Sequence, residues 1–326
     1  MTTNAGAAQR QVLVLGASGG IGGEVARQLR DAGWQVRALK RGLDAEVVER
    51  DGITWMRGDA LDREAVVRAA RGSSVIVHAV NPPGYRNWPT QVLPMIDNTI
   101  AAATVAQATV VLPGTVYNYG ADAFPVLRED APQHPATRKG AIRVELERRL
   151  QEATAQGVRT IIVRAGDFFG VRAGNNWFAQ GLIKPERPVS TISVPGRPGV
   201  GHQWAYLPDV ARTMVELIER RDTLEPFARF HLGGHWDADG TQMAEAISRV
   251  AQRHGMRPAV RRFPWWLVWA AAPFVTTLRE MLEMRYLWRE PLRMDNARVT
   301  AVLGREPLTP LDTAVEATLA GLGCLR

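Results

Sequence analysis

The chain has little cysteine and little lysine for its 326 residues. Its single cysteine, Cys324, excludes an intramolecular disulfide and any zinc site built from cysteines. Only three of the 40 basic residues are lysine, and all the others are arginine. The three positions that lysine does hold, Lys40, Lys139 and Lys184, are therefore unusual in this sequence.

A long hydrophobic run is also missing. The apolar stretch at 263–278 spans 16 residues and contains Pro273, so it is too short to cross a membrane. The first nine residues lack the apolar segment of a signal peptide, which predicts a cytoplasmic protein. Three tryptophans at 265–269 leave three interpretations open: a wall over a substrate cleft, a face for a partner or a membrane surface, or a buried helix.

The basic residues form no cluster. The formal net charge is +7, but the arginines alternate with acidic residues and make no basic tail or aromatic patch, which argues against nucleic acid binding. The excess positive charge favours an anionic cofactor or substrate. His231 and His235 flank a glycine turn without a third ligand nearby, so we expect no metal site.

What the sequence does contain is a glycine-rich junction between a strand and a helix. The apolar run at 11–15 predicts a buried parallel strand, and apolar residues at helical spacing follow from Ile21. Gly16, Gly19 and Gly22 would allow a sharp turn, close approach of a pyrophosphate and tight packing of the helix on the strand. Free amides near Gly20 and Ile21 would then face the phosphates, so the junction predicts dinucleotide binding.

The pattern G-x-x-G-x-x-G, with Ala17 and Ser18 between the first two glycines, resembles the short-chain dehydrogenase/reductase superfamily, in particular its extended and atypical branches related to sugar-nucleotide epimerases. The resemblance implies an α/β fold with a Rossmann-type, doubly wound parallel sheet and a smaller C-terminal substrate lobe. It places the dinucleotide-binding core at 9–170, with 202–232 returning to it, and a mostly helical lobe at 171–201 and 233–326. It also implies a homodimer formed through helices near 90–108 and 138–156.

Residues after the expected strands indicate which cofactor would bind. Lys40 and Arg41 follow the second strand, where a basic residue suits the 2′-phosphate of NADP, so NADP(H) is favoured over NAD(H). The alternative is a solvated charge pair at a strand end. With the glycines, the resemblance makes the expected cofactor contacts Gly16, Ser18, Gly19, Gly20, Ile21, Lys40, Arg41, Asp59, Ala60, Val80, Asn81, Lys139, Ala165, Asp167 and Phe168. The expected substrate contacts are Tyr85, Tyr119, Trp177 and Trp204.

The expected catalytic helix departs from the superfamily pattern. That pattern is a tyrosine and a lysine four residues apart, followed by a glutamate; here Lys139, Arg143 and Glu147 hold the three positions and share one helical face. A lysine can move a proton, whereas an arginine stays charged and can bind ribose or phosphate. The alternative is that both are ordinary surface cations. The resemblance makes Thr115 the active-site hydroxyl, and Tyr117 could replace the missing proton donor.

These observations predict an NADP-dependent oxidoreductase acting on the carbonyl or alcohol group of a small, possibly hydrophobic substrate, as a reductase or an epimerase-like enzyme. Two alternatives stay open. One is an NADP-binding regulatory or scaffold protein without redox turnover, and the other is a redox-neutral isomerase or lyase on the same scaffold.

Overall fold

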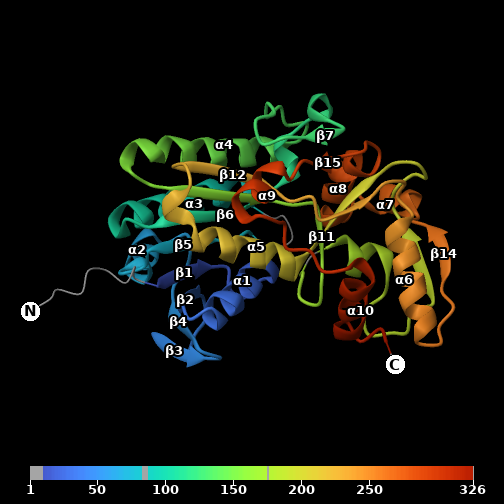
Figure 1. The fold of residues 1–326 in the computed structure, drawn as a ribbon, viewed down its shortest axis with the longest axis horizontal. Helices are drawn as coiled ribbons and strands as arrows, with labels where there is room; N and C mark the ends of the chain where they lie inside the picture. Colours follow the sequence, from blue (N-terminus) through green and yellow to red (C-terminus); the bar gives the residue numbers. More distant parts are fainter. Residues whose placement is uncertain (1–9, 83–86, 175, 326) are drawn as a thin grey trace, which may run out of the picture.

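The computed structural model describes residues 10–82, 87–174 and 176–325 (Figure 1). Its central feature is an eight-stranded sheet with the order β12-β8-β6-β5-β1-β2-β4-β3, in which every neighbouring pair is parallel except β3 with β4. The strands are β1 (Gln11–Leu15), β2 (Gln35–Lys40), β3 (Val47–Arg50), β4 (Ile53–Arg57), β5 (Val75–His78), β6 (Thr109–Gly114), β8 (Thr160–Arg164) and β12 (Phe227–His231). The expected doubly wound parallel sheet is confirmed.

Two layers of helices cover the sheet, because alternate residues of the buried strands point to opposite faces. Val12 and Val14 of β1 pack against α1 (Gly20–Asp31) and α5 (Leu207–Glu219). Leu13 and Leu15 face α2 (Arg63–Ala70), α3 (Trp88–Ala106) and α4 (Arg138–Glu152) on the other side (Figure 1). The continuous apolar run of β1 therefore serves two cores at once.

Three local features depart from what general sequence rules for strands, helix prolines and helix caps would predict. Edge strand β3 was not expected, because its exposed VVER sequence has no apolar run. Pro94 lies in the second turn of α3 rather than the first, since the helix begins at Trp88 and packing on both sides holds it. Asp209 does not cap α5: it lies inside the first turn and accepts hydrogen bonds from the amide and hydroxyl of Thr309.

The later part of the chain builds a lobe beside the sheet. A third apolar core joins the turn η5 (Phe178–Leu182), β10 (Thr191–Val194), α6 (Gln242–Arg253) and α10 (Leu311–Gly321). Strand β14 (Ala259–Arg262) pairs with β10, and a three-stranded sheet of β9 (Asp167–Phe169), β11 (His202–Tyr206) and β13 (His235–Asp237) lies nearby. Helices α7 (Trp265–Ala271) and α8 (Thr276–Glu283) and the turn η7 (Met284–Trp288) complete the lobe.

Short elements connect the sheet and the lobe. Strands β7 (Val126–Leu127) and β15 (Arg293–Met294) pair with each other, and α9 (Ala297–Leu303) packs near β12. The remaining short helical turns are η2 (Val116–Asn118), η3 (Ala121–Ala123), η4 (Ala153–Gln156) and η6 (Arg221–Thr223). None of the helices within the described ranges is long and apolar enough to cross a bilayer.

Candidate active site

The glycine junction has the geometry that its sequence predicts. Gly16 has a φ of +89°, and a Cβ at this position would lie 2.5 Å from the Ala79 carbonyl oxygen. A Cβ on Gly22 would overlap the Gly16 carbonyl, so only glycine lets α1 start this close to β1. The backbone therefore leaves an open cradle at the carboxyl end of β1.

A groove of about 660 Å³ extends from this junction across the ends of β1, β2, β4 and β5. Nine of the expected cofactor contacts line it: Gly16, Ser18, Gly19, Lys40, Arg41, Asp59, Ala60, Val80 and Asn81. The other lining residues include Asn87, Gln91 and Met95 of the α3 region, which the sequence did not single out. A dinucleotide fits this lining, because the groove combines a glycine cradle at one end with hydrogen-bonding and basic side chains at the other.

Gly20 and Ile21 do not line the groove, contrary to expectation. The carbonyl oxygens of Arg172 and Ala173 lie against Gly20, 2.7 and 2.8 Å from where its Cβ would stand. The Ile21 side chain packs on the apolar core instead.

The two basic residues at the end of β2 are both exposed to the groove. Lys40 Nζ lies 5.7 Å from the centre of the Trp55 ring, and Arg41 pairs with Asp59 at 3.6 Å. The Arg41 side chain is 72% exposed, so water screens this ion pair and the guanidinium can reach an anionic ligand.

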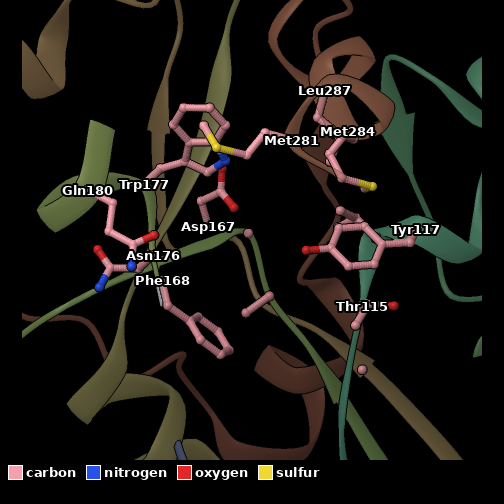
Figure 2. A pocket seen from close by; sticks show the side chains of 14 residues that line it. Thr115, Tyr117, Asp167, Phe168, Asn176, Trp177, Gln180, Met281, Met284 and Leu287 are labelled. Carbon is pink, nitrogen blue, oxygen red and sulfur yellow. The ribbon is translucent and has the colours of Figure 1, made fainter. Parts of the chain in front are cut away.

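A second, smaller cavity of about 160 Å³ lies where β6 and β8 end and the lobe begins (Figure 2). We call it the central cavity. Figure 2 shows Tyr117 on one side of it, with Asp167, Phe168 and Trp177 on the other. Its lining residues are Gly114, Thr115, Val116, Tyr117, Ala165, Gly166, Asp167, Phe168, Asn176, Trp177, Gln180, Met281, Met284 and Leu287.

The loop after β6 carries Tyr117 into this cavity, with its phenol directed at the open space (Figure 2). The loop is held against α4 because Gly140 has no side chain, and a Cβ there would overlap the Tyr117 carbonyl oxygen. Thr115 lines the cavity but its hydroxyl turns away and donates to Asn118 Oδ1 at 2.9 Å (Figure 2). Of the two expected hydroxyls, Tyr117 is the one that faces the cavity.

The three residues of α4 that align with the superfamily's tyrosine, lysine and glutamate are all buried. Lys139, Arg143 and Glu147 are each less than 5% exposed, so the alternative that the two cations are ordinary surface residues is wrong. Lys139 Nζ pairs with Glu283 of α8 at 3.3 Å, and the same carboxylate accepts the Arg138 amide at the start of α4. Glu283 thus connects the lobe to the first turn of the predicted catalytic helix.

Arg143 lies beneath the loop that carries Tyr117. Its Nη2 donates to the Pro113 carbonyl at 2.8 Å, while its buried Nε has no hydrogen-bond partner among the described residues. Burial lowers the pKa of Arg143 to about 10, and Tyr117, when ionised, is near enough to favour the arginine cation.

A buried polar network supports this loop from the other side. Arg164 Nη2 contacts both Glu147 oxygens, at 3.0 and 2.9 Å, and Gln133 donates to Glu147. Burial raises the pKa of Glu147, but the Arg164 charge and hydrogen bonds outweigh it, and the net pKa lies below its usual value. Arg164 also donates to the Thr115 carbonyl, which fixes the start of the Tyr117 loop.

The far wall of the central cavity carries Asp167, the one charged side chain among the described lining residues. The Asp167 carboxylate lies 2.8 Å from His202 Nε2. The imidazole is in turn stacked on Trp288, with ring centres 3.7 Å apart and nearly parallel planes. His202 therefore holds Asp167 in place.

Two of the expected substrate contacts do not line the central cavity. Tyr119 is fully buried, with its ring against Arg164 and His231, and does not line the central cavity. Trp204 is buried in the lobe core, because β11 turns it toward Phe169 rather than toward the cavity. Trp177 does line the cavity, and Tyr85 lies outside the described residues.

Sequence reasoning missed most of the cavity wall formed by the lobe. Met281, Met284 and Leu287 come from α8 and η7, more than a hundred residues after β8, and nothing in their helical pattern distinguishes them from core residues. Asn176 and Gln180 beside the predicted Trp177 were detectable only as polar neighbours of an aromatic residue.

Comparison with known proteins identifies the family. A family model described as the NAD dependent epimerase/dehydratase family matches residues 12–233. The chain belongs to this family. The match includes the glycine junction, α4 and β8, and it confirms the superfamily predicted from the sequence.

Individual relatives are more distant. A UDP-glucose 4-epimerase of Azospirillum brasilense is 31% identical over 180 residues, half of each chain. A (4-alkanoyl-5-oxo-2,5-dihydrofuran-3-yl)methyl phosphate reductase of Streptomyces griseus is 40% identical over 72 residues, 22% of this chain and 25% of the reductase. The chain thus matches at most about half the length of these curated relatives.

Solved structures agree in fold over nearly the whole chain. A putative epimerase from Burkholderia cenocepacia has a TM-score of 0.72 at 20% identity, covering 98% of this chain and 99% of that one. MoeE5 bound to UDP-glucose and NAD has a TM-score of 0.70 at 20% identity, covering 95% and 98%. At this identity the likeness concerns the fold.

Proposed function

We propose that this family member is an NADP-favouring oxidoreductase that acts on the carbonyl or alcohol group of a small apolar compound, as a reductase or in an epimerase-like reaction. The observation that carries the substrate class is the lining of the central cavity. Among its described residues the one charge is the Asp167 carboxylate, and the apolar lining includes Phe168, Trp177 and two methionines. A nucleotide diphosphate would meet no cation among these described residues, whereas an uncharged apolar compound suits such a wall.

The groove along the glycine junction would hold the dinucleotide, with Gly16, Ser18 and Gly19 at the pyrophosphate and Lys40 and Arg41 at the 2′-phosphate. Ala165, Asp167 and Phe168 would enclose its nicotinamide end beside the central cavity. When bound, a nicotinamide dinucleotide supplies or accepts the hydride. The cytoplasmic location expected from the sequence stays a prediction.

The chain's own part in the reaction is to move the proton that accompanies the hydride. Tyr117 would donate its phenolic proton to the substrate oxygen during reduction and take it back during oxidation. Arg143, in the family's lysine position, would stabilise the resulting phenolate through its buried charge. Lys139 would hold the Tyr117 side of α4 to the lobe through its ion pair with Glu283.

The test uses Tyr117→Phe and Lys139→Met with purified protein, NADPH and a series of small apolar aldehydes and ketones. Removing the phenol should lower kcat by about a hundredfold, the ordinary size of a general-acid contribution, with the Kd for NADPH unchanged. Lys139→Met should also reduce turnover with NADPH binding kept. Tyr286→Phe is the matched control, because its buried hydroxyl does not line the central cavity.

Two outcomes would contradict the proposal. Full activity of Tyr117→Phe would exclude the phenol as proton donor. NADPH binding without turnover of any substrate would favour the alternative of a nucleotide-binding regulatory protein. The observation that supports this alternative is that Lys139, at the superfamily's tyrosine position, forms an ion pair with Glu283.

A further inference from the structure

The outer surface of the lobe displays large apolar side chains in an unusual concentration. Twelve such side chains are exposed in the described part of the chain, and five of them fall within ten residues: Trp266, Leu267, Trp269, Phe274 and Val275. We call these five side chains the tryptophan face. Trp266 is 69% exposed and Phe274 is 89% exposed. Single exposed apolar residues are ordinary, but a cluster containing two tryptophans and a phenylalanine indicates an interaction surface.

The helix that carries this face is anchored from its inner side. Trp265 Nε1 donates to the Pro195 carbonyl at 2.8 Å, its ring meets Trp177, and Arg285 lies 4.9 Å from its centre. Val268 is buried. The inner residues hold α7 in place, so the outer side chains are not needed for packing and remain available for contact.

The sequence that leads into and through this face carries basic but no acidic residues. No aspartate or glutamate occurs from Ala246 to Arg279. Arg261 and Arg262 are exposed immediately before α7, and Arg279 is exposed on α8, which packs against α7 at the end of the molecule (Figure 1). An apolar face bordered by arginines complements a surface with anionic groups above an apolar interior.

We propose that the tryptophan face docks the protein onto an anionic lipid bilayer. The aromatic side chains enter the interfacial region, where tryptophan is favoured, and the bordering arginines contact acidic headgroups. A second copy of the chain fits less well, because a two-fold contact would bring the Arg261–Arg262 pairs of both copies to the same apolar interface.

The docking surface adjoins the central cavity through one pair of helices. Met281 of α8 and Met284 of η7 line the cavity, while α7 beside them carries the tryptophan face. Resting on the proposed function, docking would bring the cavity near a source of apolar substrate. Lipid binding itself does not depend on which reaction the cavity supports.

The test measures sedimentation of the full chain with vesicles of phosphatidylcholine alone and of phosphatidylcholine mixed with phosphatidylglycerol. Wild type should bind the anionic vesicles, with weaker binding at high salt. The triple variant Trp266→Ser, Trp269→Ser, Phe274→Ser should lower the partition coefficient by about tenfold or more. Arg261→Ala with Arg262→Ala should weaken binding to the anionic vesicles and reduce its salt dependence.

Leu308→Ser is the matched control, because Leu308 is an exposed apolar residue outside the tryptophan face. It should leave vesicle binding unchanged, and the thermal midpoint of every variant shows that the fold is intact. Absence of wild-type binding, or equal binding by the triple variant, would overturn the proposal. Loss of a dimer in the triple variant without any vesicle binding would assign the face to self-association instead.

NADPH binding, measured on the same proteins, should be the same in all of them. Vesicle binding without turnover would support lipid docking and contradict the proposed reaction. Turnover without vesicle binding would support the proposed reaction and contradict lipid docking.

Discussion

Arg164 and Glu147 form a buried ion pair beneath the loop that carries Tyr117. Replacing Glu147 by Gln would leave the Arg164 guanidinium buried without its counter-charge. Removing one partner of a buried pair costs about 3–5 kcal/mol, and we expect a loss of about this size in urea unfolding.

Glu145→Gln is the matched control for this prediction. Glu145 lies on the same helix and pairs with Arg148 and Arg149 at the surface, where such contacts contribute less than about 1 kcal/mol. Equal losses in the two variants would show that burial does not govern the contribution of the Arg164 pair.

His78 is a second residue whose behaviour follows from burial. Its Nδ1 lies 2.8 Å from the Thr99 hydroxyl, and burial, with a smaller effect of the Arg143 charge, lowers its pKa to about 3. His78 is therefore a buried histidine of the core whose ring has a hydrogen-bond partner. The folded protein therefore keeps this imidazole neutral well below the pH at which the unfolded chain protonates it.

The free energy of unfolding should therefore decrease as the pH decreases. Between about pH 6.5 and 3 the unfolded state binds the additional proton, so each buried histidine makes stability decline by about 1.4 kcal/mol per pH unit as pH decreases. His231, with its pKa also lowered by burial to about 3, acts in the same direction. His78→Asn should give a shallower slope of unfolding free energy between pH 6 and 4, measured by urea titration.

Asn98→Ala provides the comparison: Asn98 has no titratable group, so this variant should leave the slope unchanged. An identical slope in wild type and His78→Asn would mean that the imidazole at 78 is protonated in the folded state as well.

At the scale of elements, α4 and the loop after β6 are fitted to each other at Gly140. A Cβ at this position would overlap the Tyr117 carbonyl oxygen and lie 2.7 Å from the Pro135 side chain. Gly140→Ala should therefore displace the loop. We expect turnover to fall about tenfold and stability to fall by about 1–3 kcal/mol, while NADPH binding stays close to wild type because the groove lies elsewhere.

Gly196→Ala is a suitable control, since a Cβ there would meet no atom closer than 3.5 Å. If Gly140→Ala lowered the thermal midpoint but left kcat intact, the position of Tyr117 would be irrelevant to the reaction.

At the scale of the whole molecule, the groove at the ends of four strands should discriminate between the two dinucleotides. Titration with NADPH and NADH, followed by tryptophan quenching and thermal shift, should show tighter binding of NADPH. Arg41→Ala should weaken NADPH binding by about tenfold, the effect of one lost charge contact, and leave NADH binding unchanged. Arg68→Ala, an exposed arginine of α2, should change neither.

Equal affinity of wild type for the two dinucleotides would remove the 2′-phosphate argument. The homodimer implied by the resemblance also stays a prediction. Helices α3 and α4 do lie together on one face of the sheet, and sedimentation velocity would decide the assembly.

The sequence alone was sufficient for the core. The run at β1, the glycine junction and the helical spacing after it are local patterns, and local backbone sterics give them one structure. The expected strand at 11–15 is β1, and the helix expected after it from Ile21 is α1, which begins one residue earlier. Even the alignment of Lys139, Arg143 and Glu147 on one face followed from helical period.

Only the tertiary structure determined which side chains these residues contact. The partner of Lys139 is Glu283, far along the chain, and no local pattern connects the two. Tyr117 and Tyr119 lie two residues apart in one loop, yet one lines the cavity and the other is fully buried. The apolar stretch at 263–278 divides in the same way, with Trp265 packed inward and Trp266 exposed, because burial depends on which neighbours the whole fold brings to each side chain.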